Sequence, residues 1–241
     1  FALIAELHME YEDGSRQVIC TDESWQYRES FIKESDIYDG EAQDYLSYWE
    51  TASVLFPARK IPLSKDSLCA RYSIPVKPHE TLPVQQVIST PAGETVLDLG
   101  QNFAGYMEFS SRLPKGAAVT LEFGEVLQKG CFYHDNYRTA KSRFVYVSDG
   151  TERLVRPFFT FFGFRYVKVS GWPGVLRPED FSGRAVYSDL ERIGFVETSH
   201  EKLNRLYENS LWGLKSNFLD MPTDCPQRDE RLGWTGDAQV F

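Results

Sequence analysis

The sequence of 241 residues predicts a mainly β protein, with two antiparallel β-sandwich regions followed by one long helix. Three observations support this fold class. Short segments alternate apolar and polar residues, which is typical of strands with one buried face. Asp-Gly pairs, which favour tight hairpin turns, follow several of these segments. Helical spacing of apolar residues occurs once, after residue 198, so the earlier segments are expected to pair as antiparallel strands.

The first β region is predicted from the start of the sequence onward. Its first strand has apolar residues at alternate positions, namely Leu3, Ala5, Leu7, Met9 and Tyr11. Asp13 and Gly14 then predict a hairpin turn, and residues 18–20 begin the return strand. A second turn of the same kind is predicted at Asp39 and Gly40.

A domain boundary is predicted within residues 57–83, which carry five of the twelve prolines. Proline lacks the N–H that a sheet requires, so it favours linkers and edge strands. Beyond this segment, residues 95–99, 117–123, 144–147 and 166–169 predict the strands of a second region. We therefore divide this part of the chain into a first sandwich over residues 1–78 and a second over residues 79–188.

The only long helix is predicted over residues 199–219. Its apolar residues recur at helical spacing: Leu203, Leu206, Tyr207, Leu211, Leu214 and Phe218. Thr198 and Glu201 fit a capping box, and Pro222 is expected to end the helix. One amphipathic helix needs partners for its apolar face, and no other helix is predicted. We therefore expect residues 189–241 to be the truncated start of an all-helical domain.

Composition and charge exclude several functions. The net charge of −9 repels phosphate backbones, so nucleic acid is not an expected partner. The longest apolar run, residues 158–164, is too short to span a bilayer. The four cysteines are scattered, without a CxxC pair or a His/Cys cluster, so no metal site is expected. Nucleotide-binding and zinc-protease motifs are also lacking, and we expect no cofactor.

The segment from residue 220 to 237 is the candidate for chemistry. It reads as a loop, yet it is dense in ionisable and aromatic residues: Asp220, Asp224, Arg228, Asp229, Glu230, Arg231, Trp234 and Asp237. Sugar hydrolysis uses this mixture, because a carboxylic acid protonates the glycosidic oxygen and an indole packs on the sugar ring. Composition alone leaves an alternative open, a solvated loop whose two arginines pair with its acids.

Three stretches carry a resemblance to a known family. Residues 224–237 read Asp-Cys-Pro-Gln-Arg-Asp-Glu-Arg-Leu-Gly-Trp-Thr-Gly-Asp and resemble the catalytic signature of bacterial α-L-rhamnosidases, glycoside hydrolase family 78. Residues 98–105 and 157–174 resemble the β domain before the catalytic barrel, although Phe162 stands where the family often has a polar residue. Residues 36–41 resemble the end of its N-terminal sugar-binding-like sandwich, but residues 42–45 depart from the usual pattern. The resemblance implies that residues 189–241 begin an (α/α)6-barrel.

The resemblance also implies a function and its residues. The family releases terminal α-L-rhamnose from plant glycosides or polysaccharides by an inverting mechanism. Glu230 matches the general acid, and Asp224, Arg228, Trp234 and Asp237 match residues that line the sugar subsite. The general base is a glutamate further along the barrel, outside this sequence, so the chain alone is expected to be inactive. The expected partner is a rhamnose-containing oligosaccharide or glycoside.

Other interpretations stay open. The alternative function is a non-catalytic β-sandwich module that binds carbohydrate or has a structural role. The open reading frame separates the two, since only the enzyme requires several hundred further residues with a distant glutamate. The oligomeric state, with a homo-oligomer among the alternatives, and the compartment are not determined by the sequence.

Overall fold

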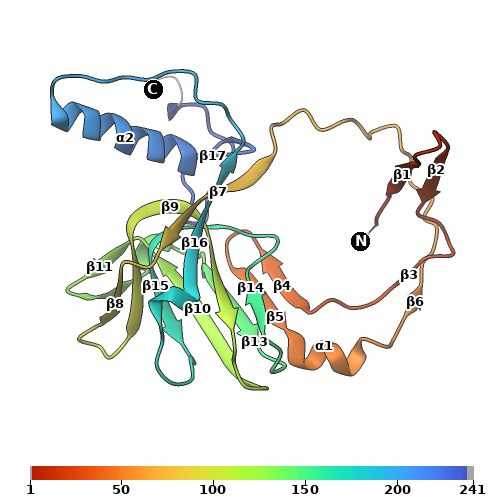
Figure 1. Cartoon of the computed structure of the whole chain (residues 1–241), viewed down its shortest axis with the longest axis horizontal. Coiled ribbons are helices and arrows are strands. Elements are labelled where there is room, and N and C mark those ends of the chain that lie inside the picture. Colours follow the sequence, from red (N-terminus) through yellow and green to blue (C-terminus); the bar gives the residue numbers. More distant parts are fainter. Residues whose placement is uncertain (1, 238–241) are drawn as a thin grey trace. The chain divides into compact units, whose positions relative to one another are not determined.

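The computed structural model describes residues 2–237 of the chain, which forms two compact units. Unit 1 comprises Phe1–Phe31 and Ser47–Arg71, and unit 2 comprises Ile32–Leu46 and Tyr72–Phe241. The chain is mainly β, as predicted, and the one long helix within residues 2–237 lies near the C-terminal end (Figure 1).

Unit 1 consists of small two-stranded ribbons. Strands β1 (Glu6–Glu10) and β2 (Arg16–Cys20) form the predicted hairpin around Asp13 and Gly14, and β3 (Gln26–Tyr27) pairs with β6 (Phe56–Pro57). The short helix α1 (Tyr45–Thr51) passes from unit 2 into unit 1. Most of the alternating apolar residues of the hairpin stay exposed; Leu7, for example, is 56% exposed, while Met9 is half-buried. Within the described part of unit 1, no second layer covers this face.

Unit 2 is built on one large curled sheet (Figure 1). Its strands run in the order β4 (Ile32–Asp36), β5 (Gly40–Asp44), β13 (Arg143–Val147), β10 (Ala118–Gly124), β15 (Phe162–Ser170), β9 (Thr95–Ser111), β16 (Phe181–Ser188) and β7 (Val76–Pro83). Two further strands, β8 (Gln86–Ser89) and β14 (Arg153–Val155), pair with β9. The described pairings in this sheet are antiparallel except β5 with β13, which is parallel.

The core of unit 2 is aromatic. Alternate residues of β10 point inward, and Leu121 and Phe123 are fully buried, as the alternation predicts. Phe123 stacks on Phe162 of β15 with ring centroids 3.9 Å apart. Phe162, which stands where the resembled family often has a polar residue, is therefore part of the core, where an aromatic ring removes a large apolar area from water.

An ion pair joins two of the stretches that carry the family resemblance, residues 98–105 and 157–174. Arg165 donates two parallel hydrogen bonds to Asp98, at 2.8 and 2.9 Å, and Asp98 also accepts the main-chain N–H of Gly100 at 2.7 Å. Such bidentate pairs are stronger than single contacts. These stretches therefore hold β9 against β15.

A glycine allows β5 to join this sheet. Gly40 has φ of +108°, and a Cβ there would lie 1.8 Å from the main-chain oxygen of Arg143. Only glycine fits this close approach. The turn predicted at Asp39 and Gly40 thus attaches β4 and β5 to the sheet of the second region through β13.

Helix α2 (Glu201–Ser216) begins differently from the expected capping box. His200 is the N-cap, with no side-chain capping bond. Thr198 instead accepts the N–H of His200 at 3.1 Å, and the side-chain oxygen of Asn204 accepts the N–H of Thr198 at 2.8 Å. The helix lies against β9 and β16, and Lys215 binds Glu80 of β7 at 2.6 Å.

Short elements complete unit 2. They are the ribbon β11 (Val126–Gln128) with β12 (Cys131–Tyr133), the ribbon β17 (Phe218–Leu219) with β18 (Met221–Pro222), and the one-turn helices η1 (Asp135–Tyr137) and η2 (Pro178–Asp180). Among the described residues, no helix is long and apolar enough to cross a membrane.

Candidate active site

The candidate loop, residues 223–237, follows α2 and closes on itself. Thr223 and Gly233 form an isolated antiparallel bridge, and the N–H of Trp234 donates to the carbonyl of Pro222 at 2.9 Å. At its base, Thr223 donates to the carbonyl of Asn217 at 2.8 Å. The ends of the loop are therefore held together, and residues 224–232 form a compact excursion between them.

Arg231 anchors this loop to unit 2. It is 5% exposed, and its guanidinium donates to the carbonyls of Ile37, Phe161, Gln227 and Arg228 and to the hydroxyl of Ser142. These acceptors come from the β4–β5 turn, the residue before β15, the segment before β13, and the loop itself. Burial lowers the pKa of Arg231 to about 10, so the side chain stays charged at neutral pH. Its hydrogen bonds offset the cost of burying that charge.

Two further contacts hold the loop against the sheet. The hydroxyl of Tyr38, in the β4–β5 turn, donates to the main-chain oxygen of Glu230 at 2.7 Å. Pro226 packs against Gly163 of β15, where a Cβ would lie 2.8 Å from the proline ring. Glycine at position 163 therefore lets the loop approach the sheet closely.

Glu230 lies between two arginines. One carboxylate oxygen, Oε1, accepts Nη1 of Arg138 at 2.6 Å, and the other, Oε2, accepts Nε and Nη2 of Arg228 at 2.9 and 2.7 Å. The pKa of Glu230 is lowered to about 2, first by a hydrogen bond with Asp224 and then by the two guanidinium groups. In this arrangement Glu230 is a carboxylate at neutral pH.

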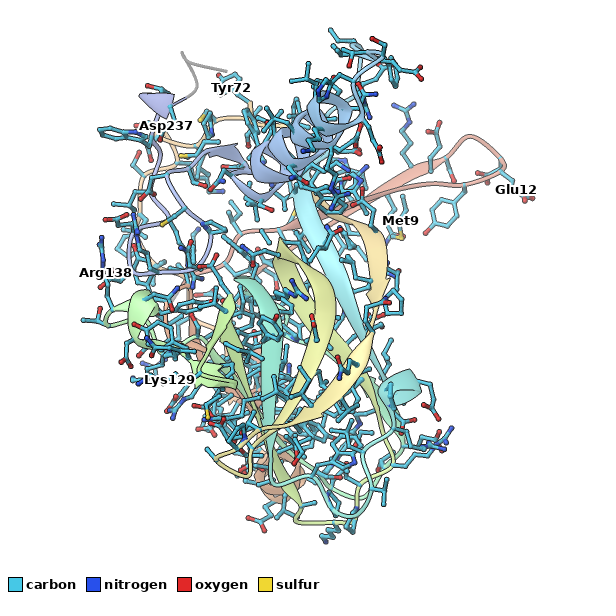
Figure 2. All side chains as sticks on the ribbon, turned by 90° about the vertical axis from the view of Figure 1, so that its left-hand side faces the viewer. Met9, Glu12, Tyr72, Lys129, Arg138 and Asp237 are labelled. Carbon is cyan, nitrogen blue, oxygen red and sulfur yellow. The ribbon has the colours of Figure 1, made fainter. Side chains whose placement is uncertain are left out.

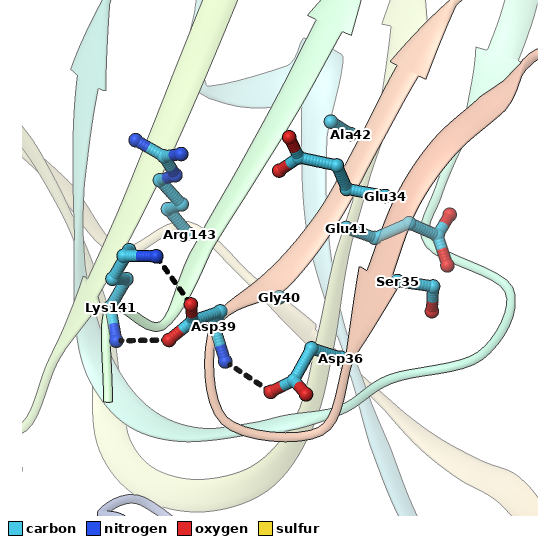
Figure 3. A pocket seen from close by; sticks show the side chains of 9 residues that line it. All are labelled: Glu34, Ser35, Asp36, Asp39, Gly40, Glu41, Ala42, Lys141 and Arg143. Atoms are coloured by element: carbon cyan, nitrogen blue, oxygen red, sulfur yellow. Dashed lines mark hydrogen bonds and ion pairs between the residues drawn. The ribbon is translucent and has the colours of Figure 1, made fainter. Parts of the chain in front are cut away.

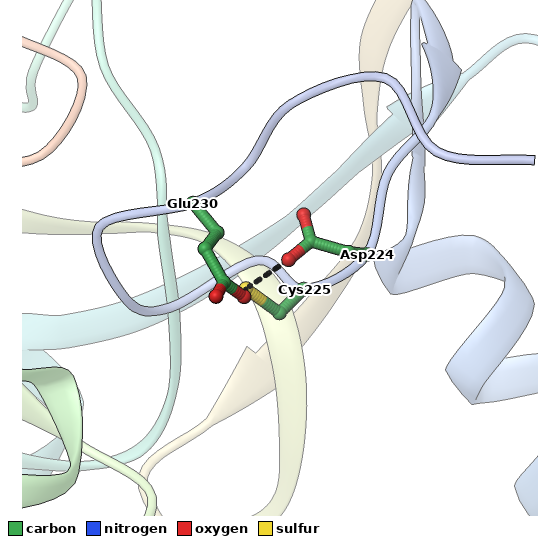
Figure 4. Close-up of side chains that lie close together, drawn as sticks. All are labelled: Asp224, Cys225 and Glu230. Carbon is green, nitrogen blue, oxygen red and sulfur yellow. Dashed lines mark hydrogen bonds between the residues drawn. The ribbon is translucent and has the colours of Figure 1, made fainter.

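Asp224 and Cys225 complete a cluster with Glu230 (Figure 4). Sγ of Cys225 lies 3.4 Å from Oδ2 of Asp224 and 3.7 Å from Oε2 of Glu230. Burial raises the pKa of the Cys225 thiol, so it stays protonated and able to donate. Oδ1 of Asp224 is buried without a hydrogen-bond partner among the described residues, which leaves an acceptor for a ligand hydroxyl.

The three ligand atoms of this cluster lie within 4.8 Å of one another, close enough to contact one metal ion. Both oxygens of Glu230 already accept hydrogen bonds from arginines, however, and two guanidinium charges would repel a cation. We therefore do not assign a metal to this cluster.

Trp234 and Asp237 lie further along the loop. Both are exposed, and the indole is 56% exposed. The indole packs on Gly236, where a Cβ would lie 2.8 Å from its Nε1. The structure thus brings Asp224, Arg228 and Glu230 together, while no described contact joins Trp234 or Asp237 to them.

Three residues of the β region contact or influence this site although sequence patterns did not single them out. Arg138 pairs with Glu230, and Thr139 donates its N–H and hydroxyl to Asp229, the hydroxyl at 2.5 Å. Glu125, after β10, has its pKa raised by burial, accepts Asn102 at 2.8 Å, and lies close enough to feel the charge of Arg228. Their type and spacing carry no motif, so only the folded chain identifies them.

A second candidate, a surface cavity of about 440 Å³, lies at the β4–β5 turn (Figure 3). Its lining includes four acidic residues together with Lys141 and Arg143. Asp39 binds Lys141 and also accepts its main-chain N–H, so this ion pair belongs to the turn itself. The cavity lacks the clustered acid, thiol and guanidinium groups of the candidate loop, which remains the stronger site.

Three family models match successive parts of the chain. The α-L-rhamnosidase N-terminal domain matches residues 1–80, the bacterial α-L-rhamnosidase concanavalin-like domain matches residues 88–187, and the bacterial α-L-rhamnosidase six-hairpin glycosidase domain matches residues 191–241. Together they span nearly the whole chain.

Curated relatives and solved structures agree with these matches. The chain is 37% identical to an α-L-rhamnosidase of Formosa agariphila and 38% identical to one of Alteromonas sp., in each case over 99% of this chain and 27% of the relative. It superposes on the native enzyme of Aspergillus terreus with a TM-score of 0.90 and 35% identity, over 99% of this chain and 29% of that one. For the Streptomyces avermitilis enzyme complexed with L-rhamnose, the TM-score is 0.89 and the identity 35%, over 99% of this chain and 24% of that one. The chain thus spans about a quarter of the length of the curated relatives it matches.

Proposed function

Because the chain belongs to the bacterial α-L-rhamnosidase family, glycoside hydrolase family 78, we propose that the protein containing it releases terminal α-L-rhamnose from plant glycosides or polysaccharides with inversion. The observation that carries this proposal is the anchored loop, in which Asp224, Arg228 and Glu230 lie together. The coordinates of a relative with bound L-rhamnose support the choice of sugar.

In the proposed reaction, Glu230 is the general acid. It donates its proton to the glycosidic oxygen as the bond to the anomeric carbon breaks, and the aglycone leaves as an alcohol. A water molecule attacks the opposite face of the sugar and gives its proton to a second carboxylate. In inverting enzymes the two carboxyl groups stand roughly 6.5–9.5 Å apart, which leaves room for that water.

Glu230 must gain a proton before it can act. In the ligand-free arrangement the hydrogen bond with Asp224 and the two arginines favour its carboxylate, and its pKa is about 2. We propose that the sugar engages Arg228 through a hydroxyl group and weakens its pairing with Glu230. Loss of a nearby positive charge raises the pKa of a carboxyl group, which then binds a proton at a higher pH.

The other proposed subsite residues recognise the sugar. Asp224 accepts a hydroxyl at its unpaired Oδ1, and Asp237 accepts another. Trp234 offers an exposed indole face to the C6 methyl side of rhamnose, an apolar patch that suits an aromatic ring.

The second carboxylate is proposed to come from another part of the whole protein, since the curated relatives are about four times as long as the matched region. Asp224 and Asp229 lie on the same loop as Glu230 and are poorly placed to activate water across the ring. The isolated 241 residues are therefore expected to be inactive on rhamnosides.

The test is Glu230→Gln in the whole protein. Glutamine keeps the size of the side chain but carries no acidic proton, so kcat on a natural disaccharide should fall roughly 10²–10⁴-fold. An aryl rhamnoside with an activated leaving group needs less protonation and should lose less activity. Equal turnover of the disaccharide by variant and wild type would refute Glu230 as the acid.

A further inference from the structure

Arg138 approaches the proposed acid from the β region. It follows the one-turn helix η1, and its side chain lies at an edge of unit 2 (Figure 2). The turn is firmly placed, because the ring of Tyr137 is fully buried and its hydroxyl donates to the carbonyl of Gly163. Arg138 itself has φ of +60°, and its side chain is 49% exposed, so it is available to a ligand.

The two oxygens of Glu230 face different surroundings. Oε2 faces groups of its own loop, Arg228 and Cys225, and this is the side of the proposed sugar subsite. Oε1 faces Arg138. A general acid stands at the glycosidic oxygen, between the sugar and the leaving group. Since the sugar residues lie on the Oε2 side, the Oε1 side is left for the leaving group.

We propose that Arg138 lines the leaving-group side of this site and favours substrates in which the rhamnose is attached to an acidic sugar, such as a uronic acid. This inference rests on the proposed function, because it takes Glu230 as the acid. A carboxylate on the leaving group matches the planar guanidinium, which binds carboxylates through two parallel hydrogen bonds.

The pairing has a consequence for catalysis. While Arg138 is bound to Glu230, it helps to keep the acid ionised. A uronate gives Arg138 another partner, and Glu230 then takes up a proton from water. The charges balance, because the uronate takes the place of the Glu230 carboxylate beside the guanidinium, while Asp229 stays next to Arg138 in both states. A neutral leaving group has no charge to draw Arg138 away, so Glu230 stays ionised for a larger fraction of the time.

The other charges around Glu230 do not play the same part. Arg228 and Asp224 belong to its own loop, on the sugar side. Asp229 lies 3.5 Å from Arg138 but is held by Thr139, and its pKa is lowered first by that hydrogen bond. Tyr38 reaches only the main-chain oxygen of Glu230. Among the described residues, Arg138 is thus the cation that pairs with Glu230 from outside the loop.

The experiment uses the whole protein and two disaccharides with the same linkage, rhamnosyl-glucuronic acid and rhamnosyl-glucose, with an aryl rhamnoside as reference. We expect kcat/KM to be about tenfold to a hundredfold higher for the acidic disaccharide. Arg138→Gln should remove this preference and raise activity on the neutral disaccharide, with the alkaline limb of its pH profile moved to higher pH. Arg138→Lys should keep part of the preference. Arg112→Gln, which breaks an exposed ion pair with Glu152, is the matched control and should behave as wild type.

The outcomes separate the two proposals. Equal cleavage of both disaccharides by the wild type would overturn the role of Arg138, as would a preference that persists in Arg138→Gln. The role of Arg138 would also be overturned if the wild type cleaved the aryl rhamnoside but neither disaccharide. Failure of the wild type on all three substrates would instead contradict the proposed function.

Discussion

Replacing Arg231 with methionine should release the candidate loop from the sheet. Methionine fills a similar volume without any donor, so four main-chain carbonyls and the hydroxyl of Ser142 lose their hydrogen bonds to the guanidinium. The charge itself is also removed from a site that is 5% exposed.

The size of the effect follows from this geometry. A hydrogen bond from a charged donor contributes about 1.5–3 kcal/mol, and a buried acceptor left unpaired costs about 1–3 kcal/mol. Part of this free energy is recovered, because the methionine variant has no charge to desolvate on folding. The cost of that desolvation in the wild type is visible in the pKa of Arg231, which burial lowers to about 10. We therefore expect the loop to lose about 3–5 kcal/mol of protection against local opening.

Amide hydrogen exchange of residues 224–233 measures this quantity directly. Each 1.4 kcal/mol changes the opening equilibrium tenfold, so exchange there should accelerate about a hundredfold to a few thousandfold while β9 and β15 stay protected. Arg231→Lys keeps the positive charge but not the planar set of donors. Its loop should therefore exchange at a rate between those of the wild type and Arg231→Met. Unchanged exchange in a folded Arg231→Met protein would refute the view that Arg231 anchors the loop, and Arg112→Gln is the control for loss of an exposed arginine.

Three further predictions concern single residues. Carboxyl NMR of the ligand-free protein should show Glu230 titrating near pH 2, and Arg138→Gln should raise this pKa. Because the pKa of Glu230 is lower in the folded state, the ionised side chain stabilises the fold above the ordinary glutamate pKa of about 4.5. This contribution to stability is lost as the pH falls toward 2. Trp234→Ala should weaken inhibition by rhamnose about tenfold or more in the whole protein, with little change in Tm, because Trp234 is 56% exposed. A fall in Tm with unchanged affinity for rhamnose would show that Trp234 has a structural role instead. Gly40→Ala should cost about 2–4 kcal/mol in urea unfolding, because its Cβ would lie 1.8 Å from the oxygen of Arg143, and an unchanged midpoint would show that the β5–β13 pairing can shift.

Local patterns were sufficient for most elements of the fold. The alternation of apolar residues over 117–123 became β10, and the Asp13-Gly14 pair became the turn of the first hairpin. The helical spacing after residue 198 became α2, which is somewhat shorter than expected. These features depend on neighbours within a few residues, so they can be predicted from sequence.

Pairings between distant segments could not be predicted in this way. The β4–β5 hairpin joins the large sheet through a parallel contact with β13, about 100 residues further along the chain. The alternation in β1 predicted a half-buried strand, yet Leu7 is exposed, because burial requires a second layer that local sequence cannot specify. The cap of α2 likewise depends on Asn204 folding back onto Thr198.

The sequence by itself determined which chemical groups the candidate loop offers, since Asp224, Arg228 and Glu230 lie within one recognisable stretch. Only the tertiary structure decided how those groups behave. Arg138, 92 residues before Glu230, supplies a charge that lowers its pKa, and Arg231 bonds to Ile37, 194 residues away, to hold the loop in place. The physical reason is range: the protonation of a carboxyl group responds to charges within a few ångströms in space, wherever in the chain they originate.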